Sequence, residues 1–181
     1  MEQVLRSVRP LLPLIPLGLG AVISLIVILG CMRTRRGMDW RAAYWRAAVD
    51  TVLIATVISI MVLTLPPSIG APRTINLVPF EELQGSVGDN GLSQLLGNAI
   101  LFIPLGLVLP WKWVTLRTFA RTVMAGIAFS AAIEVAQFIL PTGRQTSVTD
   151  VIMNAIGTAF GFFVFVGTAS IRSRGKATTT G

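Results

Sequence analysis

Five long apolar stretches, separated by short polar or charged segments, set the pattern of this 181-residue chain. They occupy roughly residues 11–32, 48–66, 94–111, 119–140 and 149–169. Each is close to the length of about 20 residues that an α-helix needs to cross the hydrocarbon core of a bilayer. No internal repeat of the kind found in inverted-repeat transporters links them. The pattern therefore predicts an all-α fold, a polytopic transmembrane helix bundle of about five spans.

Composition strengthens this prediction and removes several classes of chemistry. Hydrophobic residues make up 53% of the chain and charged residues only 13%, which is not the composition of a soluble domain. Cys31 is the single cysteine, and the chain has no histidine. An intrachain disulfide, a zinc site with paired Cys or His ligands and a Ser-His-Asp triad are thereby excluded. We therefore predict no metal site and no cofactor.

The distribution of charge predicts the orientation in the membrane. The segment "RTRRGMDWRAAYWR" after the first span holds five arginines and one aspartate. The link between the third and fourth spans and the C-terminal tail add six basic residues: Lys112, Arg117, Arg121, Arg172, Arg174 and Lys176. With five spans these segments share one side, so the positive-inside rule predicts the N-terminus outside and the C-terminus inside. The same rule accounts for the net charge of +7 without a nucleic-acid partner.

Three regions follow from this topology. Residues 1–47 would hold the first transmembrane span and a basic cytoplasmic loop, residues 48–169 a four-helix membrane domain, and residues 170–181 a disordered basic tail. The first span is too long, and is followed too directly by arginines, to be a cleaved signal peptide. An inner interfacial belt of tryptophans is expected where the helices leave the bilayer: Trp40, Trp45, Trp111 and Trp113.

The last two spans each carry a stripe of small and polar residues at helical spacing. In 119–140 the stripe consists of Gly126, Ser130, Glu134, Gln137 and Pro141, and in 149–169 of Asp150, Asn154, Gly157 and Gly161. The loop that joins these spans is short, so we expect antiparallel neighbours whose stripes face each other. The glycine pair with GxxxG spacing in the fifth span would let another backbone approach closely.

Depth along the helices places the polar groups near one membrane surface. At 1.5 Å per residue, Gln137 lies about 6 Å and Glu134 about 10 Å below the outer end of the fourth span. Asn154 lies about 6 Å below Asp150 by the same measure. These positions predict a polar pocket that opens outward in the outer leaflet. Its candidate binding residues are Glu134, Gln137, Arg144, Asp150, Asn154, Asn98, Asn76 and Arg73.

A structural role for the same residues stays open. Amide side chains in spans often join helices by hydrogen bonds alone. Glu134 favours a functional role, because an ionisable group inside a span costs roughly 2.5–3.5 kcal/mol on insertion scales. Arg144 is its expected partner, and a Glu134–Arg144 pair could also serve only as a clamp. Asp150 could instead favour the helix N-terminus through the helix dipole.

Three sequence blocks resemble the VanZ-like family of bacterial membrane proteins. These blocks are "INLVPFEEL", "NAILFIPLGLVLP" and "EVAQFILPTGRQTSVTDVIMNAIGTAFG", and the resemblance covers roughly residues 50–168. It implies an integral protein of the bacterial plasma membrane. The family's namesake is associated with low-level resistance to teicoplanin, a lipoglycopeptide antibiotic, by a route other than rebuilding the peptidoglycan target. The motif positions here are Asn76, Pro79, Phe80, Asn98, Phe102, Pro104, Gly106, Glu134, Gln137, Arg144, Asp150, Asn154 and Gly157.

Two functions from different classes follow. The first is binding or shielding of an envelope lipid or lipoglycopeptide, whose polar head would enter the pocket while its tails lie among membrane lipids. The alternative is a membrane enzyme acting on an envelope lipid or glycan, with Glu134 and Asp150 as acid and base, or with a divalent ion held between them. We favour the first, because the sequence offers no nucleophile with a neighbouring base. A scaffold or transporter component is a third, weaker reading.

Overall fold

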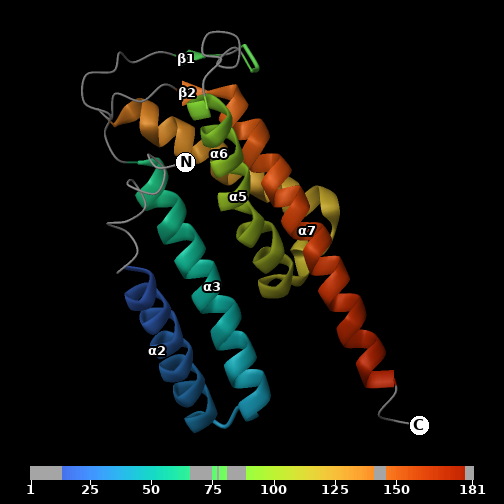
Figure 1. The fold of residues 1–181 in the computed structure, drawn as a ribbon. Helices are drawn as coiled ribbons and strands as arrows, with labels where there is room; N and C mark the ends of the chain where they lie inside the picture. Colours follow the sequence, from blue (N-terminus) through green and yellow to red (C-terminus); the bar gives the residue numbers. More distant parts are fainter. Residues whose placement is uncertain (1–13, 66–74, 77, 81–88, 141–145, 178–181) are drawn as a thin grey trace. The chain divides into compact units, whose positions relative to one another are not determined.

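A computed structural model describes residues 14–65, 75–76, 78–80, 89–140 and 146–177 (Figure 1). Its long helices are α2 (Leu14–Arg35), α3 (Trp40–Thr64), α5 (Asp89–Lys112), α6 (Phe119–Ile139) and α7 (Val148–Ala177). Within this described part of the chain, five helices are long and apolar enough to cross a membrane. The predicted all-α, five-span architecture is confirmed, and the chain is a multi-pass membrane protein. The orientation of its termini stays a prediction.

The helices extend beyond the apolar stretches that revealed them. Because α3 begins at Trp40, most of the predicted basic loop is helical, and only residues 36–39 separate α2 from α3. Helix α7 continues to Ala177, well into the segment for which the sequence predicted disorder, while residues 178–181 lie outside the described part. Arginine and alanine are good helix formers. Hydropathy therefore marks the membrane core of a span and not the ends of its helix.

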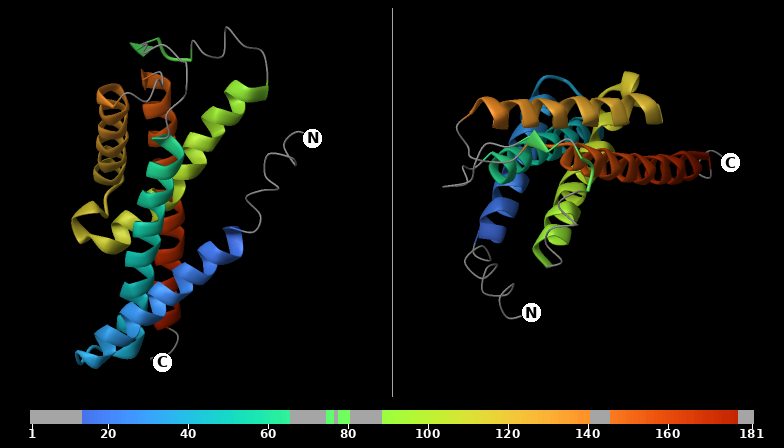
Figure 2. Two further views of the ribbon diagram at one scale, coloured as in Figure 1. Left: turned by 90° about the vertical axis from the view of Figure 1, so that its left-hand side faces the viewer. Right: turned by 90° about the horizontal axis from the view of Figure 1, so that it is seen from above.

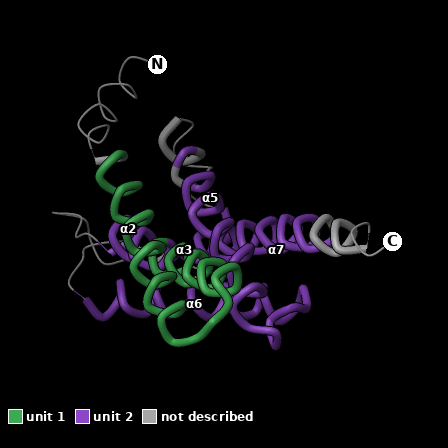
Figure 3. The backbone as a smooth tube through the Cα atoms, turned by 90° about the horizontal axis from the view of Figure 1, so that it is seen from below, with its two compact units in different colours: residues 1–55 green, residues 56–181 purple. Residues whose placement is uncertain are grey.

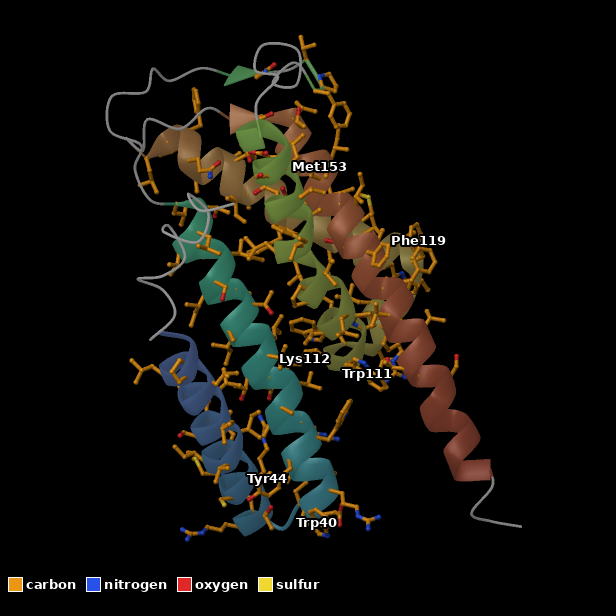
Figure 4. The ribbon with its side chains drawn as sticks, in the orientation of Figure 1. Trp40, Tyr44, Trp111, Lys112, Phe119 and Met153 are labelled. Carbon is orange, nitrogen blue, oxygen red and sulfur yellow. The ribbon has the colours of Figure 1, made fainter. Side chains whose placement is uncertain are left out.

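The chain divides into two compact units, residues 1–55 and 56–181, with the boundary inside α3 (Figure 3). In the first unit α2 and the start of α3 form a hairpin, whose turn contains Gly37 at φ +86°. Arg33 forms an ion pair with Asp50 across this hairpin. Nearby, the Cys31 thiol lies 3.2 Å from the Tyr44 hydroxyl, and Figure 4 shows Tyr44 on the side of α3 that faces α2.

In the second unit α7 lies between α6 and α5, as the view from above in Figure 2 shows. Helix α5 packs against it most extensively. A Cβ atom added at Gly157 would meet the Ala99 carbonyl, and one added at Gly161 would meet the Ile103 carbonyl. Residue numbers rise together in these two pairs, so α5 and α7 run in the same direction. The predicted GxxxG pair does allow close backbone approach, and the approaching backbone is α5.

Helix α6 runs the opposite way along α7. Gly126 and Ser130 lie beside Thr158 and Asn154 respectively, so residue numbers rise in one helix as they fall in the other. The polar stripe of α6 is its buried face, since Gly126, Ser130, Glu134 and Gln137 are all buried. The expectation of antiparallel neighbours is thereby confirmed. The stripes meet at Ser130 and Asn154, whereas Asp150, Gly157 and Gly161 of the α7 stripe face α5 and not α6.

The two ends of this unit differ in chemistry. At one end aromatic rings pack between helices: Trp111 lies 5.1 Å from Phe165, and Phe119, which Figure 4 shows against α7, lies 5.7 Å from Phe162. A short 3-10 helix, η2 (Val114–Leu116), joins α5 to α6 there. At the other end, β1 (Ile75–Asn76) and β2 (Thr146–Ser147) pair in parallel, Ile75 with Thr146 and Asn76 with Ser147. The sequence did not predict this strand pair.

Candidate functional site

The polar residues singled out in the sequence gather at the end of the second unit where β1 and β2 pair. We call Asn76, Asn98, Glu134, Gln137, Asp150 and Asn154 the polar cluster. Its members come from β1, the first half of α5, the last turns of α6 and the first turns of α7. Two further predicted residues, Arg73 and Arg144, lie outside the described residues.

Glu134 joins α6 to the start of α7. Its side chain is only 7% exposed, and Oε2 accepts a hydrogen bond from the backbone N–H of Ser147 at 3.1 Å. Ser147 is also the residue of β2 that pairs with Asn76 of β1. A single short segment therefore links the buried carboxylate of α6 to the strand that precedes α5 in the chain.

The segment after β1 is bonded to the first turn of α7. Asn76 is buried, and its Oδ1 accepts the N–H of Val78 at 3.0 Å, which turns the chain back towards the helices. The N–H of Phe80 then donates to Oγ1 of Thr149 at 2.9 Å. Phe80 adopts φ +61°, a conformation that a residue with a side chain rarely takes. Such residues concentrate at functional sites, where surrounding contacts hold the backbone in place.

Asn98 and Asp150 connect α5 to α7. Nδ2 of Asn98 donates to Oδ1 of Asp150 at 2.6 Å, a short distance that fits a bond to a charged acceptor. Both side chains are partly exposed, unlike the fully enclosed residues around them. Asp150 thus has a side-chain partner on another helix, beyond the favourable position near the start of α7 that the sequence suggested.

Asn154 lies deeper between α6 and α7. Its Nδ2 donates to the hydroxyl of Ser130 at 2.8 Å, and Thr158 donates to its backbone carbonyl at 2.8 Å. The side chain is 5% exposed, and its Oδ1 has no hydrogen-bond partner among the described residues. A buried acceptor of this kind can receive a hydrogen bond from a bound molecule at little further cost, because its desolvation has already occurred.

Gln137 faces the end of α3. Its Nε2 donates to the backbone carbonyl of Thr64 at 2.6 Å, within the second unit. This carbonyl belongs to the last turn of α3, where helix carbonyls have no partner inside the helix. Gln137 therefore joins α6 to the end of α3, which is the structural role that the sequence left open for amide side chains in spans.

Several contributors were not evident from the sequence. Ser147 directly precedes α7, and its Oγ accepts the N–H of Thr149 at 3.2 Å, which is the hydrogen bond of a helix N-cap. Oγ1 of Thr149 in turn accepts the N–H of Phe80. Nothing in the sequence indicated that the Thr64 carbonyl takes part, because every residue carries the same backbone groups. Within the described part of the chain, no three His, Cys, Asp or Glu side chains gather as a metal site would require.

The comparison with known families concerns this same region. The family model VanZ/LLP1 matches residues 51–170, more than half of the chain. The chain belongs to the VanZ/LLP1 family. Protein VanZ of Enterococcus faecium is 29% identical over 93 residues, which are 51% of this chain and 53% of that relative. The alignment therefore spans about half the length of the relative, and no solved structure matches the chain.

Every residue of the polar cluster lies within the VanZ/LLP1 match, and α2 and the first part of α3 lie outside it. The match thus separates the hairpin that forms the first unit from the helices that carry the polar cluster. The resemblance found in the sequence blocks is confirmed at the level of the family.

Proposed function

We propose that this VanZ/LLP1 protein resides in the plasma membrane of a bacterium and binds the polar head of an envelope lipid or a lipoglycopeptide. The polar cluster would be the binding site. The predicted orientation, with the N-terminus outside, places this cluster in the outer leaflet, where such molecules are found. Binding would capture or shield the molecule, and teicoplanin-type resistance is one consequence to be tested.

The buried carboxylate of Glu134 carries this proposal. An ionisable group in a spanning helix costs several kcal/mol, roughly 2.5–3.5 on insertion scales, and commonly marks a functional site. The bond from Ser147 satisfies part of its acceptor capacity. Helix joining alone could use a cheaper amide, as Gln137 does with Thr64. The choice of a carboxylate therefore favours a role in binding.

The chemistry of the polar cluster suits a head group rich in hydroxyl, amide or amine groups. Carboxylates and the buried Oδ1 of Asn154 accept hydrogen bonds, while amide nitrogens donate them. Arg144, which precedes β2 in the sequence, would add a donor for phosphate or carboxylate. The acyl tails would lie against the exposed apolar face of α7, which includes Ile156 and Phe160.

The test compares Glu134→Gln with Val135→Ala in cells that depend on the protein for growth in teicoplanin. Glutamine keeps an oxygen for the Ser147 N–H and removes the charge, so membrane abundance should stay near that of the unsubstituted protein while tolerance is lost. Val135 is an exposed neighbour on α6, and its variant should change neither quantity. Native mass spectrometry of the purified protein supplies a second readout, a retained lipid that disappears in Glu134→Gln.

Three other results would oppose the proposal. Full tolerance and lipid retention in Glu134→Gln would leave no role for the charge. Loss of abundance in Glu134→Ala, with Glu134→Gln normal in every assay, would make Glu134 a structural clamp. Turnover of labelled envelope lipids that stops in both Glu134→Gln and Asp150→Asn would replace binding by the enzymatic alternative.

A further inference from the structure

The hairpin of α2 and the first part of α3 lies outside the family match up to residue 50, so its features need an explanation of their own. Residues 33–50 contain five arginines and two aspartates, concentrated around a turn of four residues. Both aspartates are engaged within the hairpin. Asp50 pairs with Arg33, and Oδ2 of Asp39 accepts the N–H of Ala42 at 3.1 Å at the start of α3.

The remaining arginines face solvent. Arg35, Arg36, Arg41 and Arg46 are all exposed. None of these four guanidinium groups forms an ion pair or hydrogen bond with another residue that the structure describes, although that of Arg41 lies 5.3 Å from the Trp40 ring centre. They therefore concentrate positive charge at the tip of the hairpin without an internal counter-charge.

The other basic connection in the chain behaves differently. In the link between α5 and α6, Nε of Arg117 donates to the carbonyl of Pro110 at 3.3 Å. Arg121, in the first turn of α6, donates back to the carbonyl of Thr115 in the link at 3.2 Å. These guanidinium groups complete the ends of their own link, a structural use of arginine. The contrast marks the hairpin as the basic connection that is open to a ligand.

Tryptophans beside the arginines indicate the depth in the membrane at which this charge lies. Trp40 is 60% exposed and Trp45 is 40% exposed, and Figure 4 shows Trp40 at the start of α3, next to the turn. Exposed tryptophans at the ends of spanning helices lie at the level of lipid head groups. Charges placed beside them meet the phosphates of the same layer before they meet any soluble molecule.

We propose that the tip of the α2–α3 hairpin, formed by Arg35, Arg36, Trp40, Arg41, Trp45 and Arg46, is a binding surface for anionic phospholipid head groups. A guanidinium matches the geometry of a phosphate and can donate two parallel hydrogen bonds to it. Basic clusters next to a transmembrane helix attract anionic lipid, and each arginine strengthens that attraction about fivefold. This surface is independent of the polar cluster and of its proposed ligand.

The experiment uses the full chain in detergent, titrated with phosphatidylglycerol or with phosphatidylcholine and read out by native mass spectrometry. The unsubstituted protein should retain phosphatidylglycerol preferentially, and added salt should reduce that preference. The double variant Arg35→Gln/Arg36→Gln should weaken phosphatidylglycerol binding by about tenfold or more and leave phosphatidylcholine binding unchanged. The variant Arg35→Lys/Arg36→Lys should keep most of the binding.

Removal of two charges from the α5–α6 link, Arg117→Gln/Arg121→Gln, is the matched control and should keep the preference. Equal losses in both double variants would show a general effect of net charge and overturn the proposal. Equal binding of the two lipids by the unsubstituted protein would overturn it as well, without reference to any variant. Tighter binding of a short single-stranded oligonucleotide than of phosphatidylglycerol would assign the surface to a different partner.

Discussion

The side-chain amide of Asn98 on α5 donates a 2.6 Å hydrogen bond to the Asp150 carboxylate on α7. The two helices run in the same direction and are separated in the chain by α6, so this bond ties together spans that are not neighbours in sequence. It also fixes Asp150 at the edge of the polar cluster, where that carboxylate is only partly enclosed.

Loss of this bond should destabilise the bundle. Asn98→Ala should lower the free energy of unfolding by about 1.5–3 kcal/mol, the usual range for a hydrogen bond to a charged group. The thermal unfolding of the protein in detergent measures this change. Ile100→Ala, at an exposed position on the same helix, should have a much smaller effect. An equal drop in both variants would assign the loss to helix α5 in general.

The glycines of α7 should respond to alanine according to what each one faces. Gly157→Ala and Gly161→Ala place a methyl group against α5 carbonyls, so each should cost about 1–3 kcal/mol or more. Gly167 has nothing within 4 Å of an added Cβ, and alanine there should be neutral or slightly stabilising. Thermal unfolding and membrane abundance both report the difference. Similar behaviour at all three positions would contradict the close packing of α5 on α7.

Because Phe80 has a positive φ, a glycine variant there should be more stable than an alanine variant, the reverse of the usual order. Phe80→Ala and Phe80→Gly both remove the ring, but glycine adopts φ +61° without steric cost, so it should be the more stable by about 1 kcal/mol. At Val78, an exposed neighbour that is not at positive φ, alanine should be equal to or better than glycine. A more stable alanine variant at Phe80 would mean that the residue does not hold this conformation in the protein.

Charge reversal should test the ion pair of the first unit. Removal of one partner, as in Asp50→Ala, should cost about 1–3 kcal/mol, between the values for exposed and fully buried pairs. The double variant Arg33→Asp/Asp50→Arg should recover part of that loss. Arg36→Ala, an exposed arginine of the same hairpin, should leave the unfolding temperature in lipid-free detergent nearly unchanged. No recovery in the double variant would mean that the pair contributes through packing and not through charge.

Much of the second unit could be predicted because its helices follow a simple period. Ser130 and Asn154 stand at positions with helical spacing, and the short loop between their helices brings these two residues together, as their 2.8 Å bond confirms. The start of α3 at Trp40 was missed because hydropathy does not detect helical residues at the membrane surface. The pairing of Asn76 with Ser147 was missed for another reason, since strands of two residues carry no period.

The pairing of β1 with β2 also sets an order of events during synthesis. Ile75 leaves the ribosome 71 positions before its partner Thr146, so β1 waits while α5 and α6 enter the membrane. The Glu134 carboxylate likewise cannot accept the hydrogen bond from the Ser147 N–H until the chain has been made as far as the start of α7. A nascent protein arrested after α6 would therefore span the membrane with its polar residues unassembled. Completion of the polar cluster coincides with insertion of the last helix.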